Sequence, residues 1–181
     1  EDLKKDFALP IEPISLDGFK ETVDFNYSIW KKNNVRSHKV SGHSIVNISL
    51  TKLGAAPGDA TSEQMRILAK LADQFSSGEI RTTKRQTIVF PFVRKDQIFN
   101  LWKSLEQYGL ASPHQGTLAQ IVSCPGRDYC DLAKAVSIPI ATRVQERFND
   151  MNKLLDIGEL NINISGCENS CAHHHIADIG L

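Results

Sequence analysis

The stretch that decides the fold is TSEQMRILAKLADQFSSG, residues 61–78. It opens on Thr61 with Gln64 three residues later, which is the signature of a capping box at a helix N-terminus. Apolar residues then recur at helical spacing until Gly78 ends the pattern. They are Met65, Ile67, Leu68, Leu71, Ala72 and Phe75. The stretch therefore predicts an amphipathic helix with one buried face.

Strand and helix patterns flank this helix on both sides. Residues 40–50 alternate apolar and small polar residues, and residues 79–93 are rich in β-branched residues, so both predict strands. Residues 96–109 return to helical spacing. Residues 40–110 thus read as strand, helix, strand, helix, and residues 1–39 before them are expected to be a connecting arm.

A second α/β unit is expected over residues 111–181. Its predicted elements are a short strand at 118–123, helical material over 131–151 interrupted near Pro139, and an alternating strand at 160–165. The fold class predicted for the whole chain is α+β.

Composition restricts the function classes. The 181 residues are 41% hydrophobic and 23% charged, and 21 basic residues balance 21 acidic ones, so neither nucleic acid nor a membrane surface is favoured. No apolar run approaches the ~20 residues that span a bilayer, and no signal-peptide core is present. We expect a cytoplasmic protein. The absence of an initiator Met and the apolar last residues suggest a fragment of a longer chain.

The four cysteines fall in two pairs, CPGRDYC at 124–130 and CENSC at 167–171. Four thiolates can bind zinc, bind an iron-sulfur cluster or form two disulfides, and a reducing cytoplasm disfavours disulfides. Structural zinc usually sits on tighter knuckles than the five-residue gap between Cys124 and Cys130. Zinc or inert buried thiols stay open on spacing alone.

Local structure is expected to bring the two cysteines of each pair close to one another. Pro125-Gly126 predicts a turn after Cys124, and a helical stretch over 131–136 would let Cys130 curl back. A helical turn starting near Gly166 would put Cys167 and Cys171 on one face, with free amides favouring an anionic cluster.

The residues that flank the cysteines are more specific than the cysteine spacing, because they resemble a known family. ISGCENSCAHHHIADIGL at 164–181 resembles the segment around the last two cysteines of the sulfite and nitrite reductase haemoproteins, with Glu168 where a proline is usual. Residues 35–110 resemble the ferredoxin-like half-domain of that family, including RTTKRQT at 81–87.

The resemblance implies a ferredoxin-like half-domain at 40–110, with an antiparallel sheet and two helices, and a truncated cluster-binding domain at 111–181. It implies a 4Fe-4S cluster on Cys124, Cys130, Cys167 and Cys171, with Cys171 also touching the iron of sirohaem. The implied reaction is the six-electron reduction of sulfite to sulfide or of nitrite to ammonia, with ferredoxin or a flavoprotein as electron donor. A fragment is expected to be inactive alone.

Basic residues are needed for sirohaem carboxylates and an anionic substrate. Arg81, Lys84 and Arg85 are the candidates, although a solvated strand face would explain them equally well. Three consecutive histidines, His173 to His175, cannot all ligate one ion from a helix, so we expect surface or supporting roles. Trp30 and Trp102 are expected to pack in the core.

Two other functions remain open at this stage. One is a stand-alone iron-sulfur module that passes electrons to a partner without binding sirohaem. The other is a zinc-stabilised binding domain without redox chemistry, which would be colourless.

Overall fold

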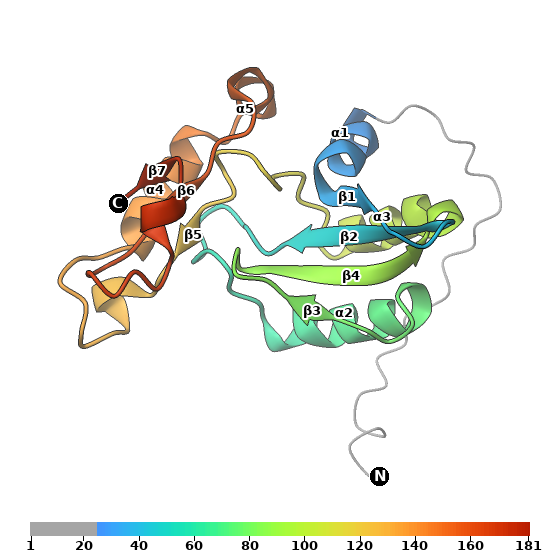
Figure 1. Cartoon of the computed structure of the whole chain (residues 1–181), viewed down its shortest axis with the longest axis horizontal. Helices are drawn as coiled ribbons and strands as arrows, with labels where there is room; N and C mark the ends of the chain where they lie inside the picture. The colour runs from blue at the N-terminus through green and yellow to red at the C-terminus, as the bar shows by residue number, and fades with distance from the viewer. Residues whose placement is uncertain (1–24) are drawn as a thin grey trace, which may run out of the picture.

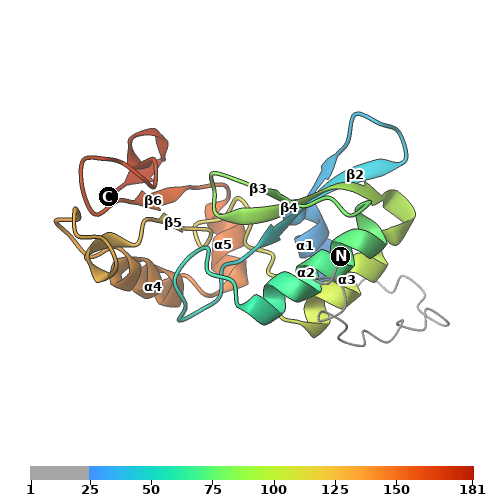
Figure 2. The same cartoon turned by 90° about the horizontal axis from the view of Figure 1, so that it is seen from below.

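The first unit is a four-stranded antiparallel sheet with its helices on one face. The computed structural model describes residues 25–181, and Figure 2 shows α1, α2 and α3 together beneath the sheet. The strand order is β1-β2-β4-β3. The elements are α1 Phe25–Asn34, β1 Val35–Ser37, β2 His43–Ser49, α2 Ser62–Phe75, β3 Arg81–Thr82, β4 Thr87–Arg94, η2 Lys95–Gln97 and α3 Ile98–Gln107.

Helix α2 forms where the sequence predicts it. The Thr61 hydroxyl accepts a hydrogen bond from the Gln64 amide at 3.1 Å, and the Gln64 side chain accepts one from the Thr61 amide at 2.9 Å. The helix buries its predicted apolar face against the sheet, and Met65 is the one predicted residue left exposed. The capping box and the periodicity are both confirmed.

Aromatic side chains fill the core of this unit. Trp30 is fully buried and Trp102 is 1% exposed, and the ring of Tyr27 packs near both, with its centroid 6.3 Å from that of Trp30 and 5.2 Å from that of Trp102. Each such ring buries a large apolar area, which is the dominant stabilising term in a domain of this size. The predicted packing role of both tryptophans is confirmed.

The connecting arm predicted for residues 1–39 is wrong for its described part. Phe25–Asn34 form α1, which packs on the core through Trp30, and Val35–Ser37 pair with β2 as an edge strand. The mixed polarity of α1 hid its periodicity. Residues 1–24 lie outside the described part of the chain.

Residues 79–93 are a hairpin, not one strand. Arg81 and Thr82 pair with β4, and a turn over residues 83–86 separates the strands, with Gln86 at φ 56°.

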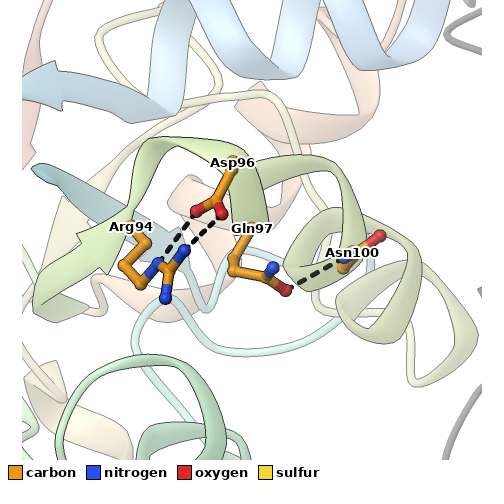
Figure 3. Close-up of polar contacts among 4 residues, drawn as sticks. All are labelled: Arg94, Asp96, Gln97 and Asn100. Atoms are coloured by element: carbon orange, nitrogen blue, oxygen red, sulfur yellow. Dashed lines mark hydrogen bonds and ion pairs between the residues drawn. The ribbon is translucent and has the colours of Figure 1, made fainter. Parts of the chain in front are cut away.

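At the far end of β4, Arg94 donates to both oxygens of Asp96 at 3.0 and 2.6 Å, and Asn100 donates to Gln97 at 3.0 Å (Figure 3). The exposed Arg94–Asp96 pair and the partly buried Gln97–Asn100 contact lie where the chain enters α3.

The second unit lies beside the sheet of the first (Figure 1) and is built on three parallel strands in the order β5-β6-β7. Its small core packs two helices on these strands. The elements are β5 Val122–Ser123, η3 Gly126–Asp128, α4 Ile138–Arg147, α5 Met151–Ile157, β6 Ile162–Ile164, η4 His174–Ile176 and β7 Ile179–Gly180.

Two local predictions for this unit need correction. Pro139 stands in the first turn of α4, where its missing amide needs no partner, so it begins a helix and does not interrupt one. Residues 131–136 form turns, not a helix. The predicted α+β class, with an antiparallel half-domain followed by an α/β unit, is confirmed. No described helix has the length and apolar character needed to cross a membrane.

Buried hydrogen bonds join the two units. The Ser49 hydroxyl at the end of β2 donates to the Gln120 side chain at 2.6 Å, and both residues are almost fully buried. The fully buried Asn34 side chain donates to the carbonyl oxygens of Asn47 and Ser112 at 2.9 and 3.0 Å. The half-domain and the cysteine-bearing unit are therefore fixed relative to each other by interior contacts.

Candidate functional site

The two cysteine pairs follow neighbouring parallel strands. Cys124 comes directly after β5, and Cys167 lies three residues beyond the end of β6. The Cys124 amide donates to Ile164 at 3.0 Å, and the amides of Lys134 and Ala135 both donate to Gly166 at 2.8 and 3.0 Å. Loops at the carboxyl ends of parallel strands are common binding sites in α/β sheets. The backbone therefore brings both cysteine loops to one end of the second sheet.

Two glycines allow these loops to approach closely. A Cβ on Gly126 would lie 2.6 Å from the Ser137 amide nitrogen, and one on Gly166 would lie 2.8 Å from the Ala135 carbonyl oxygen. Gly126 also has φ 60°, a conformation that side chains rarely adopt. The predicted turn at Pro125-Gly126 is confirmed, and the loops leave no room there for a side chain.

Cys124 is the most buried of the four thiols, at 9% exposure. Its sulfur accepts a hydrogen bond from the Gly166 amide at 3.1 Å and lies 3.4 Å from the Ser137 hydroxyl. Burial raises the pKa of the Cys124 thiol, but hydrogen bonds from Ser137 and from the amides of Gly166 and Gly126 outweigh it and leave this pKa below its ordinary value. Such a sulfur suits a metal-bound thiolate, which accepts N–H···S bonds.

The other three thiols are less enclosed. Cys130 and Cys167 are half-buried, Cys171 is exposed, and all four cysteines are free of disulfides. The helical turn predicted near Gly166 is wrong, because residues 166–173 form successive turns with Ser170 and His173 at positive φ. Across residues 25–181 no three His, Cys, Asp or Glu side chains lie close enough together to hold one metal ion.

An ion pair ties the two cysteine loops at the surface. Lys134 donates to both oxygens of Glu168 at 2.8 and 3.0 Å. The hydrogen bond from Lys134 lowers the pKa of Glu168, and the same bond raises the pKa of Lys134. Glu168, which stands where the resembling family usually has proline, thus contacts the loop of the first cysteine pair.

The three basic candidates separate in the structure. Lys84 and Arg85 lie on the hairpin turn and line a cavity of about 140 Å³ with Asn161, Asn163 and His173. Arg81 instead pairs with Glu79 at 2.6 Å on the exposed edge strand β3. Two of the three candidates therefore share a pocket next to the cysteine loops, and Arg81 does not line it.

Arg85 reaches across from the first unit to the second. Its guanidinium donates to the Asn161 side chain, and its Nε atom is buried without a hydrogen-bond partner. Burial lowers the pKa of Arg85, while the charge of Asp178 acts in the opposite direction. A solvated strand face, the alternative interpretation of this residue, does not describe a half-buried arginine in a pocket.

Sequence reasoning missed Asn161 and Asn163. Both lie on the stretch 160–165, whose alternation predicted a strand, and the same alternation puts the two asparagines on one face. Asn163 donates to the His173 carbonyl oxygen at 3.1 Å, while its own side-chain oxygen is buried without a hydrogen-bond partner. Polar residues at every second position of a buried strand were the available signal.

The histidine run occupies the turn after Cys171. His173 and His175 are exposed, and the rings of His174 and His175 lie 3.9 Å apart. Only His174 and His175 belong to a helical segment, the 3-10 turn η4, with His173 before it in a left-handed conformation. The three side chains are not part of any metal-binding group among residues 25–181.

Known proteins resemble this chain in sequence. The family model described as nitrite/sulfite reductase ferredoxin-like half domain matches residues 52–108. Sulfite reductase (ferredoxin) 2 of Mycolicibacterium paratuberculosis is 31% identical over 138 residues, which are 73% of this chain and 25% of that protein. The chloroplastic ferredoxin–nitrite reductase of Spinacia oleracea is 26% identical over 175 residues, 96% of this chain and 28% of that protein.

The fold has the same relatives. The structure of the Mycobacterium tuberculosis NirA protein matches with a TM-score of 0.62 and 27% identity, over 81% of this chain and 26% of that one. The chain thus spans about a quarter of the length of each of these proteins. Residues 52–108 thus match the nitrite/sulfite reductase half-domain family, and the chain as a whole is similar in sequence to sulfite and nitrite reductases and in fold to the NirA protein.

Proposed function

We propose that this chain is the cluster-bearing part of a sirohaem-dependent reductase that converts sulfite to sulfide or nitrite to ammonia. Residues 40–110 would be its ferredoxin-like half-domain and residues 111–181 part of its cluster-binding domain. Electrons would come from ferredoxin, which the names of two relatives mention, or from a flavoprotein. Because the chain spans about a quarter of its relatives, it is expected to be inactive alone.

The observation that carries the proposal is the shared position of the cysteine loops. Both loops follow parallel strands. Backbone hydrogen bonds join residues 124–135 of the first loop to residues 164–166 of the second. Cys124, Cys130, Cys167 and Cys171 are the proposed ligands of a 4Fe-4S cluster. Since no three ligand side chains lie together in residues 25–181, the loops must close further around a cluster.

The chain's own residues have distinct parts in this proposal. Cys124, buried with hydrogen bonds to its sulfur, holds the inner corner, and Cys171, exposed at the rim, is the thiol proposed to touch both the cluster and the sirohaem iron. Bound together, the two groups would pass electrons from the donor to the substrate until the six that the reaction consumes have been delivered. Lys84 and Arg85, with their pocket, are proposed to bind carboxylates or the anionic substrate; Arg81 has a weaker claim because it is paired with Glu79.

Exposed apolar side chains on the cysteine loops support a large neighbour there. Tyr129 is 82% exposed, and Leu132 and Ile176 are each 71% exposed. Each of these side chains lies within five residues of one of the four cysteines, and large exposed apolar side chains near a site are candidates for contact with a bound group or partner. A tetrapyrrole or a further part of the reductase would cover them.

The test is anaerobic reconstitution of the 181-residue chain with iron and sulfide, followed by metal and sulfide counting. We expect about four irons and four sulfides per chain. One zinc with no iron would contradict the proposal and support a zinc-stabilised binding domain.

The shared thiol is tested in the longest protein that binds sirohaem. Cys171→Ser is compared with Cys130→Ser, which also removes a proposed cluster ligand but no sirohaem contact. We expect Cys130→Ser to keep the spectroscopic coupling between cluster and sirohaem in the fraction of molecules that retains a cluster, and Cys171→Ser to lose the coupling in that fraction as well. Equal coupling in the two variants would rule out the shared role, and absence of any sirohaem absorption would favour a simple electron-transfer module.

A further inference from the structure

Gln86 connects the hairpin of the first unit to the strand that leads into Cys124. Its Nε2 atom donates to the Ser123 carbonyl oxygen at 2.7 Å, and its Oε1 atom accepts from the Ser123 amide at 3.0 Å. One side-chain amide thus satisfies both backbone groups of one residue. This is the hydrogen-bonding pattern of a neighbouring β-strand.

The strand geometry explains why Ser123 needs this partner. In the sheet order β5-β6-β7, β5 is an edge strand. The Cys124 amide points to β6 and donates to Ile164. Backbone groups alternate in direction along a strand, so those of Ser123 point to the open edge, where Gln86 meets them.

The Gln86 side chain is itself held in place. The Gln86 backbone has φ 56°, and its backbone amide donates to the Thr83 carbonyl oxygen at 3.1 Å within the turn. Gly58 packs directly behind it, because a Cβ there would lie 2.8 Å from the Gln86 Cβ. Because its backbone and its Cβ are both held in place, the Gln86 side chain loses little conformational entropy when it binds Ser123.

We propose that Gln86 is a positioning residue for Cys124. Its amide completes the open edge of β5 and thereby fixes the thiol one residue further on, where the Gly166 amide donates to the sulfur. A residue of the half-domain thus sets the geometry of a ligand in the cysteine-bearing unit. The metal-binding consequence rests on the proposed function, but the positioning itself does not.

The first test uses the metal-free 181-residue chain and measures the alkylation rate of each cysteine by mass spectrometry. Gln86→Gly keeps the positive φ and removes the amide. Loss of two hydrogen bonds should raise the Cys124 rate roughly tenfold, with changes below about twofold at Cys130, Cys167 and Cys171. Gln86→Glu keeps the acceptor for the Ser123 amide but sets a carboxylate against the Ser123 carbonyl oxygen. The Cys124 alkylation rate in this variant should lie between those of the unmodified chain and Gln86→Gly.

Ser77→Gly is the matched control, because it also replaces a positive-φ residue of the first unit with glycine and does not touch Ser123. Its Cys124 rate should stay close to that of the unmodified chain. Amide exchange gives a second readout: Gln86→Gly should speed exchange at Ser123 and leave Cys124, which donates to Ile164, protected.

Two results would overturn the proposal: an unchanged Cys124 rate in Gln86→Gly, or an equal rise at all four cysteines, which would mean general destabilisation. Neither result bears on whether the thiols bind iron, so the proposed function is judged separately. If it holds, reconstituted Gln86→Gly should retain less iron than Ser77→Gly.

Discussion

Gly126 and Gly116 have similar backbone conformations, with φ 60° and 78°, but different surroundings. A Cβ on Gly126 would collide with Ser137, whereas one on Gly116 meets nothing within 4 Å. Gly116→Ala should therefore cost only backbone strain of about 1 kcal/mol, and Gly126→Ala roughly 1–3 kcal/mol more through overpacking. Urea denaturation of both variants checks this, and equal losses would show that the loop yields easily.

His114 should make the stability of the chain depend on pH. Burial lowers its pKa from the ordinary value of 6.5, and its Nδ1 atom lies 2.8 Å from the Ser112 hydroxyl. The unfolded chain then takes up a proton at a higher pH than the folded chain does. The stability that the neutral ring contributes is complete above pH 6.5 and is lost as the pH falls from there through the folded pKa.

His114→Gln should reduce this loss, measured as the urea midpoint at pH values from about 7.5 down to 5.5. The unmodified chain, measured over the same pH range, gives the reference profile. A profile that is unchanged in His114→Gln would assign the pH dependence to other groups.

At the scale of elements, the N-terminus of α2 depends on its capping box. Thr61→Ala removes the acceptor for the Gln64 amide and should lower the free energy of unfolding by about 1 kcal/mol. The neighbouring exposed Ser62 provides the comparison, since Ser62→Ala should change stability by less than about 0.5 kcal/mol. Similar effects of both substitutions would mean that the cap hydrogen bond contributes nothing in solution.

The predictability of each element follows from how local its determinants are. Helix α2 carries its start signal, its periodicity and its end within one stretch, so the sequence was sufficient. Helix α1 has no such periodicity and is held by tertiary burial of Trp30, which no window of sequence reveals. Pro139 was misread because a proline in a helix and a proline beginning one differ only in the residues before it.

The candidate site divides in the same way. The two cysteine pairs lie on adjoining loops after β5 and β6, and the strand predicted at 118–123 is formed only by Val122–Ser123. Their roles as ligands stay a prediction. The turns at 166–173 replace the expected helix because Ser170 and His173 adopt left-handed conformations, and the contact of Gln86 with Ser123 joins residues 37 apart in sequence. Such long-range pairs are set by packing and not by local pattern.

At the scale of the whole molecule, two separate hydrophobic cores are joined by buried hydrogen bonds. Ser49→Ala and Gln120→Ala, singly and together, should give a coupling energy of about 1 kcal/mol in a double-mutant cycle. Lys103 and Glu106, an exposed pair at 2.9 Å on α3, should give a coupling near zero when treated identically. A coupling near zero for Ser49 and Gln120 would mean that the units are not held together by this contact.

The order of the parallel strands also bears on how the protein is made. Strand β5 pairs with β6, whose residues emerge roughly 40 positions later, and at synthesis rates of 5–20 residues per second that delay is a few seconds. Cys124 and Cys130 leave the ribosome during this interval ahead of Ile164 and Gly166, whose backbone groups bind Cys124 in the folded chain. A metal that needs all four thiols can therefore be inserted only after translation has passed Cys171. Until then, only the reducing conditions around the ribosome would keep Cys124 and Cys130 from being oxidised.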